Sequence, residues 1–364
     1  MIPYGRQSID RSDIESVTAI LEGDWLTQGP TIERFERELA ERVGAQHAVA
    51  FSSCTAALHG SAWSVGLGPG NVAYTSPLTF MATANAVRYV GAQPGLVDID
   101  PDSYNINLSA VPTDAEAVFP VHYAGLPIDL NPANWSFRPP KIIEDAAHAL
   151  GARTKRGPVG NCADSDLTCF SFHPVKPITT GEGGMVTTNN EELAERLRVF
   201  RSHGIVRKPE RGEWYYEIET LGYHYRMTDV QAALGLSQLR RLEQFIDKRN
   251  EIAARYRAEL GGIGDLSLPP EAPEGSLHGY HLFAVHTKRR DELFAYLRQK
   301  EVGVQVHYVP VHHHPISEDL RPDNSDFPIA DSVYFGLMSI PIHPGLTDEE
   351  VGFVVETIKR FYEV

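Results

Sequence analysis

A single lysine lies in a stretch of otherwise aromatic, small or neutral residues, SFHPVKPITTG, and its amine could do covalent chemistry. A neutral lysine condenses with a carbonyl group to form a Schiff base, and burial favours the neutral amine by lowering its pKa. A structural interpretation competes, because a lysine at the end of a strand can extend its ammonium group to solvent. Taken alone, Lys176 favours the structural interpretation.

A second candidate group is the carboxylate of Asp145, in the stretch KIIEDAAHALG. It follows an apolar run of strand length, and open α/β sheets bind their ligands at the carboxyl ends of strands. A carboxylate there could pair with the protonated ring nitrogen of pyridoxal phosphate, a cofactor that condenses with lysine. Helix capping is the favoured interpretation of Asp145 alone. The combination of Asp145 with Lys176 is more specific.

Two further stretches bear on anion binding. In SSCTAALHG, residues 52–60, small hydroxyl residues separate a predicted strand from a predicted helix. The first amides of that helix and the Thr55 hydroxyl could hold a phosphate, although ordinary capping by Ser53 or Thr55 explains the same pattern. In SVGLGPGN, residues 64–71, the glycines follow a helix and precede a strand. This order is the reverse of the dinucleotide-binding motif, so we expect a turn.

The histidine-rich segment VHYVPVHHHP, residues 306–315, raises the question of a metal site. Three adjacent histidines cannot all face one ion, and no cysteine or carboxylate stands at ligand spacing in the sequence. We therefore expect no metal, and favour substrate contacts or a plain loop.

The amino-acid composition argues against some classes of binding partner. The net charge of −15 over 364 residues argues against nucleic acid or an anionic membrane surface, although a local pocket can still bind an anionic small molecule. Three cysteines give no disulfide framework, and no stretch has a signal-peptide core or the roughly 20 apolar residues of a membrane span. We expect a cytoplasmic protein.

Strand and helix signals alternate over the first 240 residues, which predicts an α/β fold with a mostly parallel sheet covered on both faces. A Pro/Gly-rich stretch after one long predicted helix, Met227–Leu260, suggests a large domain over residues 1–240 and a smaller α+β domain over 241–364. The predicted strands are the runs HAVAF, NVAYT, PGLVDI, AVFPV, KIIED and GGMVTT.

Three other segments have helical spacing of apolar residues. Residues 13–23 have Ile14, Val17, Ile20 and Leu21 at this spacing. The helix predicted over 30–44 begins at Pro30 and stops at Gly44, with a stripe of Ile32, Phe35, Leu39 and Val43. The last predicted helix starts with a capping box of Thr347 and Glu350, and its buried stripe is Val351, Val354, Ile358 and Phe361.

Together, SSCTAALHG, GPGN, SPLTFMATANAV, EDAAHALGA, SFHPVKPITTGEGGMVTTN, FRSHG and YRMTDVQAALGLSQL resemble the DegT/DnrJ/EryC1/StrS family of sugar aminotransferases. These stretches follow one another in family order between residues 52 and 239. The resemblance implies the fold of type I enzymes that use pyridoxal phosphate, with a mostly parallel seven-stranded sheet and a small C-terminal domain. It also implies a homodimer whose active sites form at the subunit interface.

The resemblance assigns roles to individual residues. Lys176 would form the internal aldimine with pyridoxal phosphate, Asp145 would pair with the pyridine nitrogen, and His148 would lie near the phenolic oxygen. The other implied cofactor residues are Phe80, which stacks on the ring, and Thr55, Ala56 and Ser171, which hold the phosphate. The implied substrate residues are Tyr4, Trp25, Leu26, Thr27, His173, His307, Tyr308 and His314.

Two departures from the family pattern stand out. Where the family usually has Gly-x-Asn-x-Arg, with an asparagine that reaches the partner subunit's phosphate, this chain has GYHYR, with His224 in that place. Histidine can still donate to a phosphate oxygen. The second departure is NPANWSFRPP, where the family usually has a helix and the prolines make one improbable.

The implied reaction moves an amino group from glutamate to a nucleotide-linked keto sugar. Related dehydratases carry histidine in place of this lysine, so Lys176 favours transamination. The stretches DWLTQGP, SFHPVKPITT, FRSHGI and VQVHYVPVHHHP resemble the transaminases of pseudaminic acid biosynthesis, which act on a UDP-linked 4-keto-6-deoxy-N-acetylhexosamine. The alternatives are a dTDP-linked keto sugar, a lipid A arabinose precursor, an amino-acid lyase, and a non-catalytic regulator that binds pyridoxal phosphate or a sugar nucleotide.

Overall fold

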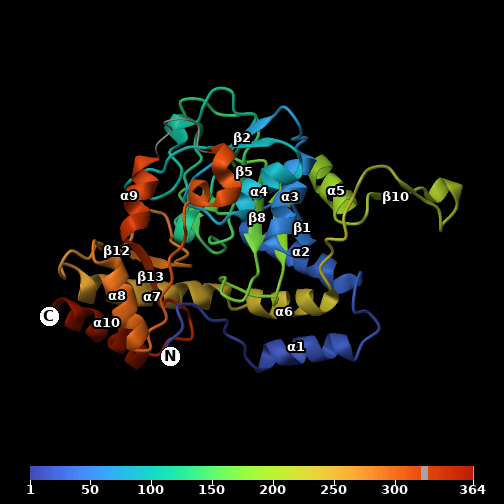
Figure 1. Ribbon diagram of the computed structural model, residues 1–364. Helices are drawn as coiled ribbons and strands as arrows, with labels where there is room; N and C mark the ends of the chain where they lie inside the picture. The colour runs from blue at the N-terminus through green and yellow to red at the C-terminus, as the bar shows by residue number, and fades with distance from the viewer. Residues whose placement is uncertain (321–326, 364) are drawn as a thin grey trace.

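The sheet at the centre of the molecule has the seven strands that the resemblance implies. The computed structural model describes residues 1–320 and 327–363 (Figure 1). Two parallel bridges, Val118 with Ile142 and Val121 with Asp145, join its two ladders, so the strand order is β3-β2-β4-β5-β8-β9-β1. Only β9 runs antiparallel to its neighbours. The strands are β1 His47–Phe51, β2 Val72–Thr75, β3 Gln93–Leu96, β4 Ala117–Phe119, β5 Ile143–Asp145, β8 Leu167–Ser171 and β9 Gly184–Thr188.

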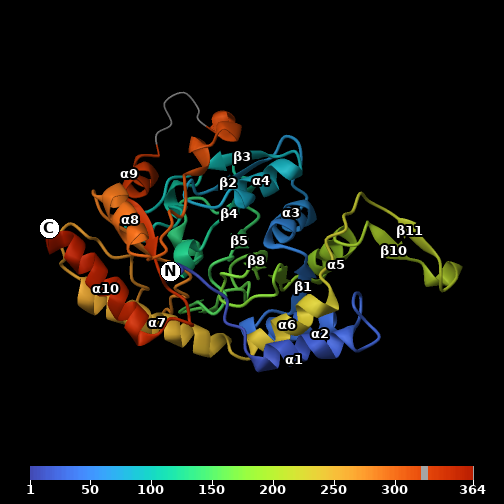
Figure 2. The same cartoon turned by 60° about the horizontal axis from the view of Figure 1, so that its bottom comes forward.

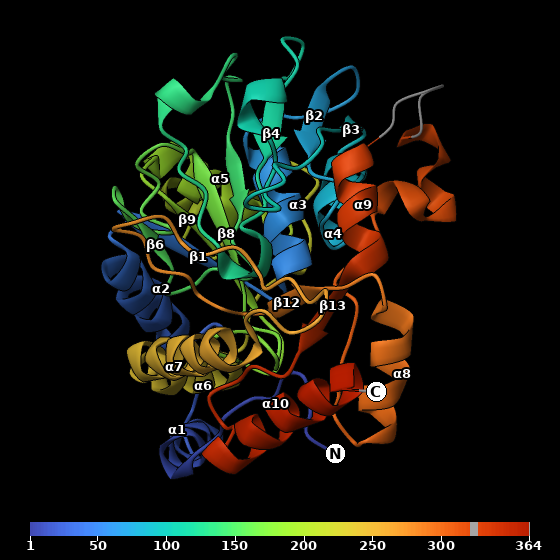
Figure 3. The same ribbon diagram turned by 90° about the vertical axis from the view of Figure 1, so that its left-hand side faces the viewer.

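Helices cover both faces of this sheet, as Figure 3 shows. Successive side chains of a strand point to opposite faces. In β1, Ala48 and Ala50 therefore join one core cluster with α2 and α6, whereas Val49 and Phe51 join another with α3, α4 and α5. The helices of this part are α1 Arg11–Leu21, α2 Pro30–Val43, α3 Cys54–Ser64, α4 Ala82–Tyr89, α5 Glu191–Phe200 and α6 Asp229–Leu239.

Two predicted helices are confirmed in detail. The stripe of α2 is buried, and Gly44 ends the helix in the left-handed region at φ 80°. In α10, Asp348–Glu363, the Thr347 hydroxyl accepts from the Glu350 amide and the Glu350 carboxylate accepts from the Thr347 amide, so the capping box is present. The apolar stripe of α10 is buried as well.

The long helix predicted over Met227–Leu260 is wrong, because the chain leaves helical geometry at Arg241 and gives α6 and α7, Leu242–Leu260. At this break the Arg241 guanidinium pairs with Asp10 and Asp13. Asp13 also accepts from the Gln238 side chain at 2.7 Å. The helix over 13–23 is confirmed as α1, but it packs on α6 through the buried Asp13, and its apolar residue Ile14 is exposed.

The C-terminal part has its own core between a two-stranded sheet and three helices. The antiparallel strands are β12 Phe283–His286 and β13 Leu337–Ile340, and the helices are α7, α8 Arg290–Gln299 and α10. Apart from Ile2, this core draws only on residues 252–362. That clustering agrees with domains over 1–240 and 241–364, a division that remains a proposal.

The segment that joins β12 to β13 returns to the large part. It contains the short 3-10 helices η5 Val311–His313 and η6 Pro315–Leu320 and the helix α9 Pro328–Gly336. The Val311 amide donates to the Pro77 carbonyl, and Asp98 accepts from the first amides of α9. The N-terminus crosses in the other direction, with Ile2 bridging Val302.

Two short hairpins complete the described structure: β6 Arg153–Thr154 with β7 Gly157–Pro158, and β10 Ile205–Arg207 with β11 Tyr216–Ile218. The β10–β11 hairpin projects from the body of the molecule (Figure 2). In NPANWSFRPP, the structure has only a 3-10 turn, Pro132–Asn134, which agrees with the expected absence of an α-helix. Among the described residues, no helix is both long and apolar enough to cross a membrane.

Candidate active site

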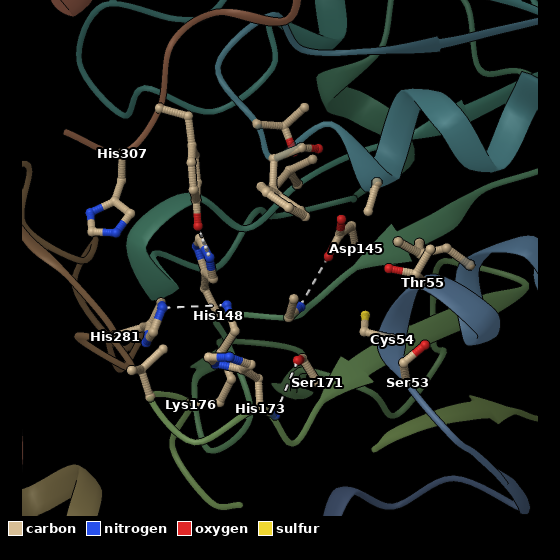
Figure 4. A pocket seen from close by; sticks show the side chains of 18 of the residues that line it. Ser53, Cys54, Thr55, Asp145, His148, Ser171, His173, Lys176, His281 and His307 are labelled. Carbon is tan, nitrogen blue, oxygen red and sulfur yellow. Dashed lines mark hydrogen bonds between the residues drawn. The ribbon is translucent and has the colours of Figure 1, made fainter. Parts of the chain in front are cut away.

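A cavity of about 320 Å³ opens where two neighbouring strands end and a helix begins (Figure 4). Asp145 is the last residue of β5, Ser171 is the last residue of β8, and Thr55 lies in the first turn of α3. The carboxyl ends of parallel strands meet at one edge of a sheet, which explains why residues distant in sequence meet here.

Lys176 lies on the connection from β8 to β9 and reaches into this cavity. The side chain is partly open to the cavity. Loss of water around its amine lowers the pKa of Lys176 to about 8, although the nearby Cys54 and Asp145 oppose the shift. Its Nζ lies 3.4 Å from His281 Nε2. An amine enclosed in this way is more often neutral than an exposed lysine, which is the condition for attack on a carbonyl group.

Asp145 faces the same cavity from the opposite side. Its carboxylate accepts a hydrogen bond from the Thr83 hydroxyl at 2.7 Å and another from the Ala147 amide at 3.1 Å. No helix begins after Asp145, so the helix-capping interpretation is wrong. The carboxylate is buried and held in one orientation, ready to pair with a cationic ring nitrogen.

The start of α3 forms the third wall. Ser53 caps the helix, because its hydroxyl accepts from the Ala56 amide at 3.1 Å. Thr55 is left to line the cavity beside the other first-turn groups of α3. A helix N-terminus carries unpaired amides and a partial positive charge, so this wall suits a phosphate. Gly184 of β9 permits the arrangement, since a Cβ there would lie 2.5 Å from the Ser53 carbonyl oxygen.

Aromatic and imidazole rings form the remaining wall. His148 Nε2 lies 3.0 Å from the Tyr308 hydroxyl, and the Tyr308 ring centroid is 5.8 Å from that of Phe80. Burial, with the nearby charge of Lys176, holds the pKa of His148 well below its usual value, so this imidazole is neutral. Phe80 is 59% exposed, leaving its ring open to a ligand in the cavity.

The cavity brings together most of the residues that the sequence predicted. Those that line it are Tyr4, Thr55, Phe80, Asp145, His148, Ser171, His173, Lys176, His307 and Tyr308, and Ala56 lies behind the wall with its amide bound to Ser53. The residues that do not line it are Trp25, Leu26, Thr27, His224 and His314.

Three of those five lie beside the start of α6. Thr27 bridges Thr228, the Leu26 carbonyl accepts from the Asp229 amide, and Trp25 next to them is exposed. His224 is exposed as well, and it bridges Ser202 after α5. His314 follows η5 as its C-cap residue.

Sequence reasoning missed several residues of the cavity. His281 precedes β12 in the C-terminal part, and no motif in the sequence linked it to Lys176. Thr83 was inside a quoted stretch, and its position near the start of α4 was the available signal for a contact with Asp145. Thr83 itself does not line the cavity; the other polar residues that line it and were not predicted as site residues are Ser53, Cys54, Thr79 and Glu182.

Comparisons with known proteins identify the family to which this arrangement belongs. The sequence profile of the DegT/DnrJ/EryC1/StrS aminotransferase family matches residues 7–359. The chain belongs to this family. Its relatives include the Bacillus subtilis spore coat polysaccharide biosynthesis protein SpsC, 39% identical over 98% of this chain and 96% of SpsC. They also include a Campylobacter jejuni UDP-4-amino-4,6-dideoxy-N-acetyl-beta-L-altrosamine transaminase, 37% identical over 100% and 98% of the two chains.

Solved structures of family members share the fold. Helicobacter pylori PseC, an aminotransferase involved in pseudaminic acid biosynthesis, superposes with a TM-score of 0.92 at 28% identity, covering 100% of this chain and 99% of its own. Spr1654 from Streptococcus pneumoniae, described in its PLP form, has a TM-score of 0.91 at 28% identity, with 100% and 98% covered. The predicted fold class and family are thus confirmed, and this chain is a sugar aminotransferase.

The cavity fits pyridoxal phosphate, the cofactor of the family. An amine, a carboxylate and a helix N-terminus line three sides of it, matching the aldehyde, ring nitrogen and phosphate of the cofactor. Two buried ring nitrogens, His148 Nδ1 and His281 Nδ1, have no hydrogen-bond partner among the described residues. Buried polar atoms ordinarily find a partner, and a bound ligand can supply one.

Proposed function

We propose that this protein transfers an amino group from glutamate to the C4 keto group of a UDP-linked 4-keto-6-deoxy-N-acetylhexosamine, with pyridoxal phosphate as cofactor. The observation that carries the proposal is the placement of Lys176 and Asp145 on opposite sides of one cavity, with the Asp145 carboxylate buried and the pKa of Lys176 lowered to about 8. The name of the Campylobacter jejuni relative, which the chain matches over its whole length, supports the sugar.

The chain's own residues divide the chemistry between them. When bound, pyridoxal phosphate supplies an electron sink that stabilises negative charge on the carbon that loses a proton. Lys176 would hold the cofactor, and its low pKa would let its free amine accept and return a proton. Asp145 would stabilise a proton on the ring nitrogen, because its carboxylate is fixed by Thr83 and Ala147.

Phosphate binding supports a shared site between two subunits. Among the described residues that line the cavity, Lys176 is the single lysine or arginine, and it would hold the aldehyde of the cofactor. Thr55, Ser171 and the start of α3 then offer only neutral donors to a phosphate. We propose that a second copy of the chain supplies His224, whose exposed position away from its own cavity suits that role.

Absorbance tests the cofactor and the donor. We expect a yellow protein whose visible band is bleached by glutamate and is absent from Lys176→Ala. Asp145→Asn is the informative companion variant: it should keep the band, because Lys176 is intact, but bleach far more slowly. A protein that stays colourless when pyridoxal phosphate is added would contradict the proposal.

The sugar needs a separate assay. Matched UDP-linked and dTDP-linked 4-keto-6-deoxy sugars should be offered with glutamate, and the aminated product read by mass. We expect amination of the UDP-linked N-acetylhexosamine. Amination of only the dTDP-linked sugar would replace the proposed substrate while leaving the reaction class intact, and failure on both would overturn the nucleotide-sugar substrate.

A further inference from the structure

A second cluster of chemically active side chains lies outside the cavity, where η5 meets α9. His312 Nε2 lies 3.0 Å from Asp331 Oδ1, and His313 Nε2 lies 2.9 Å from the same oxygen. One ligand atom from each of the three residues lies within 4.8 Å of the others. No carboxylate stands at ligand spacing in the sequence, but folding brings Asp331 of α9 to the two histidines.

Both elements are held to the scaffold. The Val311 amide donates to the Pro77 carbonyl at 2.9 Å, which holds η5 against the loop before α4. Asp98 accepts from the Ile329 and Ala330 amides at 3.0 Å each, which holds the first turn of α9. The three side chains of the cluster are thus placed by contacts made elsewhere, and a ligand would find them already oriented.

Ring packing fixes the two imidazoles as well. Phe327, Asp331 and Tyr334 are spaced four and three residues apart, so they lie on one face at the start of α9. The His312 ring lies 4.9 Å from the Phe327 ring, and the His313 ring lies 5.4 Å from the Tyr334 ring. Each imidazole is therefore supported on either side of the Asp331 carboxylate.

We propose that His312, His313 and Asp331 form a binding site for a divalent transition-metal ion, with Zn²⁺ as the preferred ion. Two imidazole nitrogens and one carboxylate oxygen are ligands that zinc accepts in proteins, and three protein ligands leave the fourth position to water. Tetrahedral zinc with bonds of about 2.0–2.2 Å keeps its ligand atoms roughly 3.3–3.6 Å apart. Small side-chain rotations reach this spacing from the observed distances.

A network of hydrogen bonds alone is the competing explanation. A carboxylate has two oxygens, and two independent imidazole donors would be free to use both. Here both Nε2 atoms approach Oδ1, as ligands of one ion converge on one point. The two explanations differ in their protons, because an ion replaces the protons that hydrogen bonding requires.

A bound ion would stabilise the structure around it and would take no part in amino transfer. None of the three residues of the site lines the cofactor cavity, but Tyr308, which does, lies three residues before Val311, the first residue of η5. An ion that ties η5 to α9 would restrain the segment that carries Tyr308 against His148. Binding to the folded chain alone would also raise its melting temperature.

Zinc titration of the tag-free, cofactor-loaded protein tests the proposal. After treatment with a chelator, Zn²⁺ should be titrated in competition with a chromophoric chelator, and Co²⁺ should be added to a second sample. We expect one Zn²⁺ per chain with a dissociation constant below about 1 μM, a visible Co²⁺ spectrum, and a higher melting temperature with Zn²⁺.

Matched variants decide between the two explanations. His313→Gln and Asp331→Asn should weaken Zn²⁺ binding by more than about 100-fold, beyond the roughly 10–100-fold that loss of an outer-shell partner costs. His314→Ala removes a histidine of the same tract that is outside the cluster and should bind as tightly as the parent. Binding that is absent from the parent, or undiminished in both cluster variants, would overturn the site. The cofactor's visible band reports whether each variant is folded.

Discussion

The lowered pKa of Lys176 leads to a prediction about this single residue. Because the pKa of Lys176 is lowered to about 8, the neutral amine becomes the major form above pH 8 rather than above the usual value of 10.5. We expect the rate at which the apo protein captures pyridoxal phosphate to rise with pH and to level off above pH 8. Stopped-flow absorbance of the visible band measures it, and a rate still rising steeply at pH 10 would contradict the assigned environment.

The hydrogen bond from Thr83 to Asp145 gives a second prediction at this scale. Thr83→Val removes the donor and keeps the shape of the side chain. Loss of a hydrogen bond to a charged group is worth about 1.5–3 kcal/mol, so we expect cofactor affinity to fall roughly 10–100-fold. Thr79→Val is the comparison variant and should lower the affinity less, because Thr79 contacts the Thr83 hydroxyl and makes no hydrogen bond to the carboxylate. Equal affinity in the parent and Thr83→Val would show that the contact does not orient Asp145.

At the scale of elements, Asp229 connects two helix starts. It is fully buried in the first turn of α6, and its carboxylate accepts from the Gly29 amide at 2.8 Å and the Thr31 amide at 3.1 Å at the start of α2. Asp229→Ala leaves both amides without this partner. We expect a loss of about 2–4 kcal/mol in the free energy of unfolding, since a hydrogen bond to a charged group contributes about 1.5–3 kcal/mol and the two amides are only partly buried.

Denaturant unfolding measures that loss, and Asp247→Ala, on α7, is the matched control for removing a carboxylate. Asp229→Ala should also loosen the segment around Gly29 and Thr31, because the amides of these two residues lose their carboxylate partner. Limited proteolysis would then cut that segment first. A stability unchanged within about 0.5 kcal/mol, the range of ordinary surface substitutions, would contradict the role of Asp229.

The same scale shows what sequence could and could not predict. Local signals sufficed for α2 and α10, because proline, glycine, a capping box and an apolar stripe all act within one helix. The break at Arg241 has no local sequence signal, because its ion-pair partners, Asp10 and Asp13, lie far away in the sequence. The strand β8 was not predicted as a separate run, although its last residue, Ser171, was recognised from a family motif.

For the candidate site, sequence motifs predicted the residues near the cofactor. They did not predict residues that reach their partners only through contacts between distant parts of the chain. Lys176 and Asp145 lie in stretches that resemble those of the family, so their meeting was predicted. His281 and Asp331 approach their partners only after the C-terminal part has packed against the sheet. A single sequence does not reveal such long-range contacts.

At the scale of the whole molecule, the proposed dimer explains the exposed apolar residues. Those on and beside the β10–β11 hairpin are Trp214, Tyr216, Ile218 and Leu221, and those near the start of α2 are Leu21, Trp25 and Leu26. We expect Trp214→Ser with Leu221→Ser to shift the protein from dimer to monomer in sedimentation velocity. Phe353→Ser, an exposed position on α10, is the control and should stay dimeric.

Mixing two inactive variants tests whether sites are shared. Lys176→Ala keeps His224, and His224→Ala keeps Lys176, so a mixed dimer with shared sites regains one complete site. Random mixing should restore about one quarter of the parent activity, because half of the dimers are mixed and each has one complete site of two. No recovery after subunit exchange, with mixed dimers verified by mass, would assign the whole phosphate site to one subunit.

The pairing of Ile2 with Val302 has a consequence for synthesis of the chain. The first residues leave the ribosome early but have no partner until nearly the whole chain has followed, and Tyr4 meets His307 at the cavity only then. Contacts of such long sequence separation form late in folding. The wall of the cavity that contains Tyr4 and His307 therefore forms late in folding, whereas the residues that would hold the cofactor, from Thr55 to Lys176, depend on contacts of shorter sequence separation.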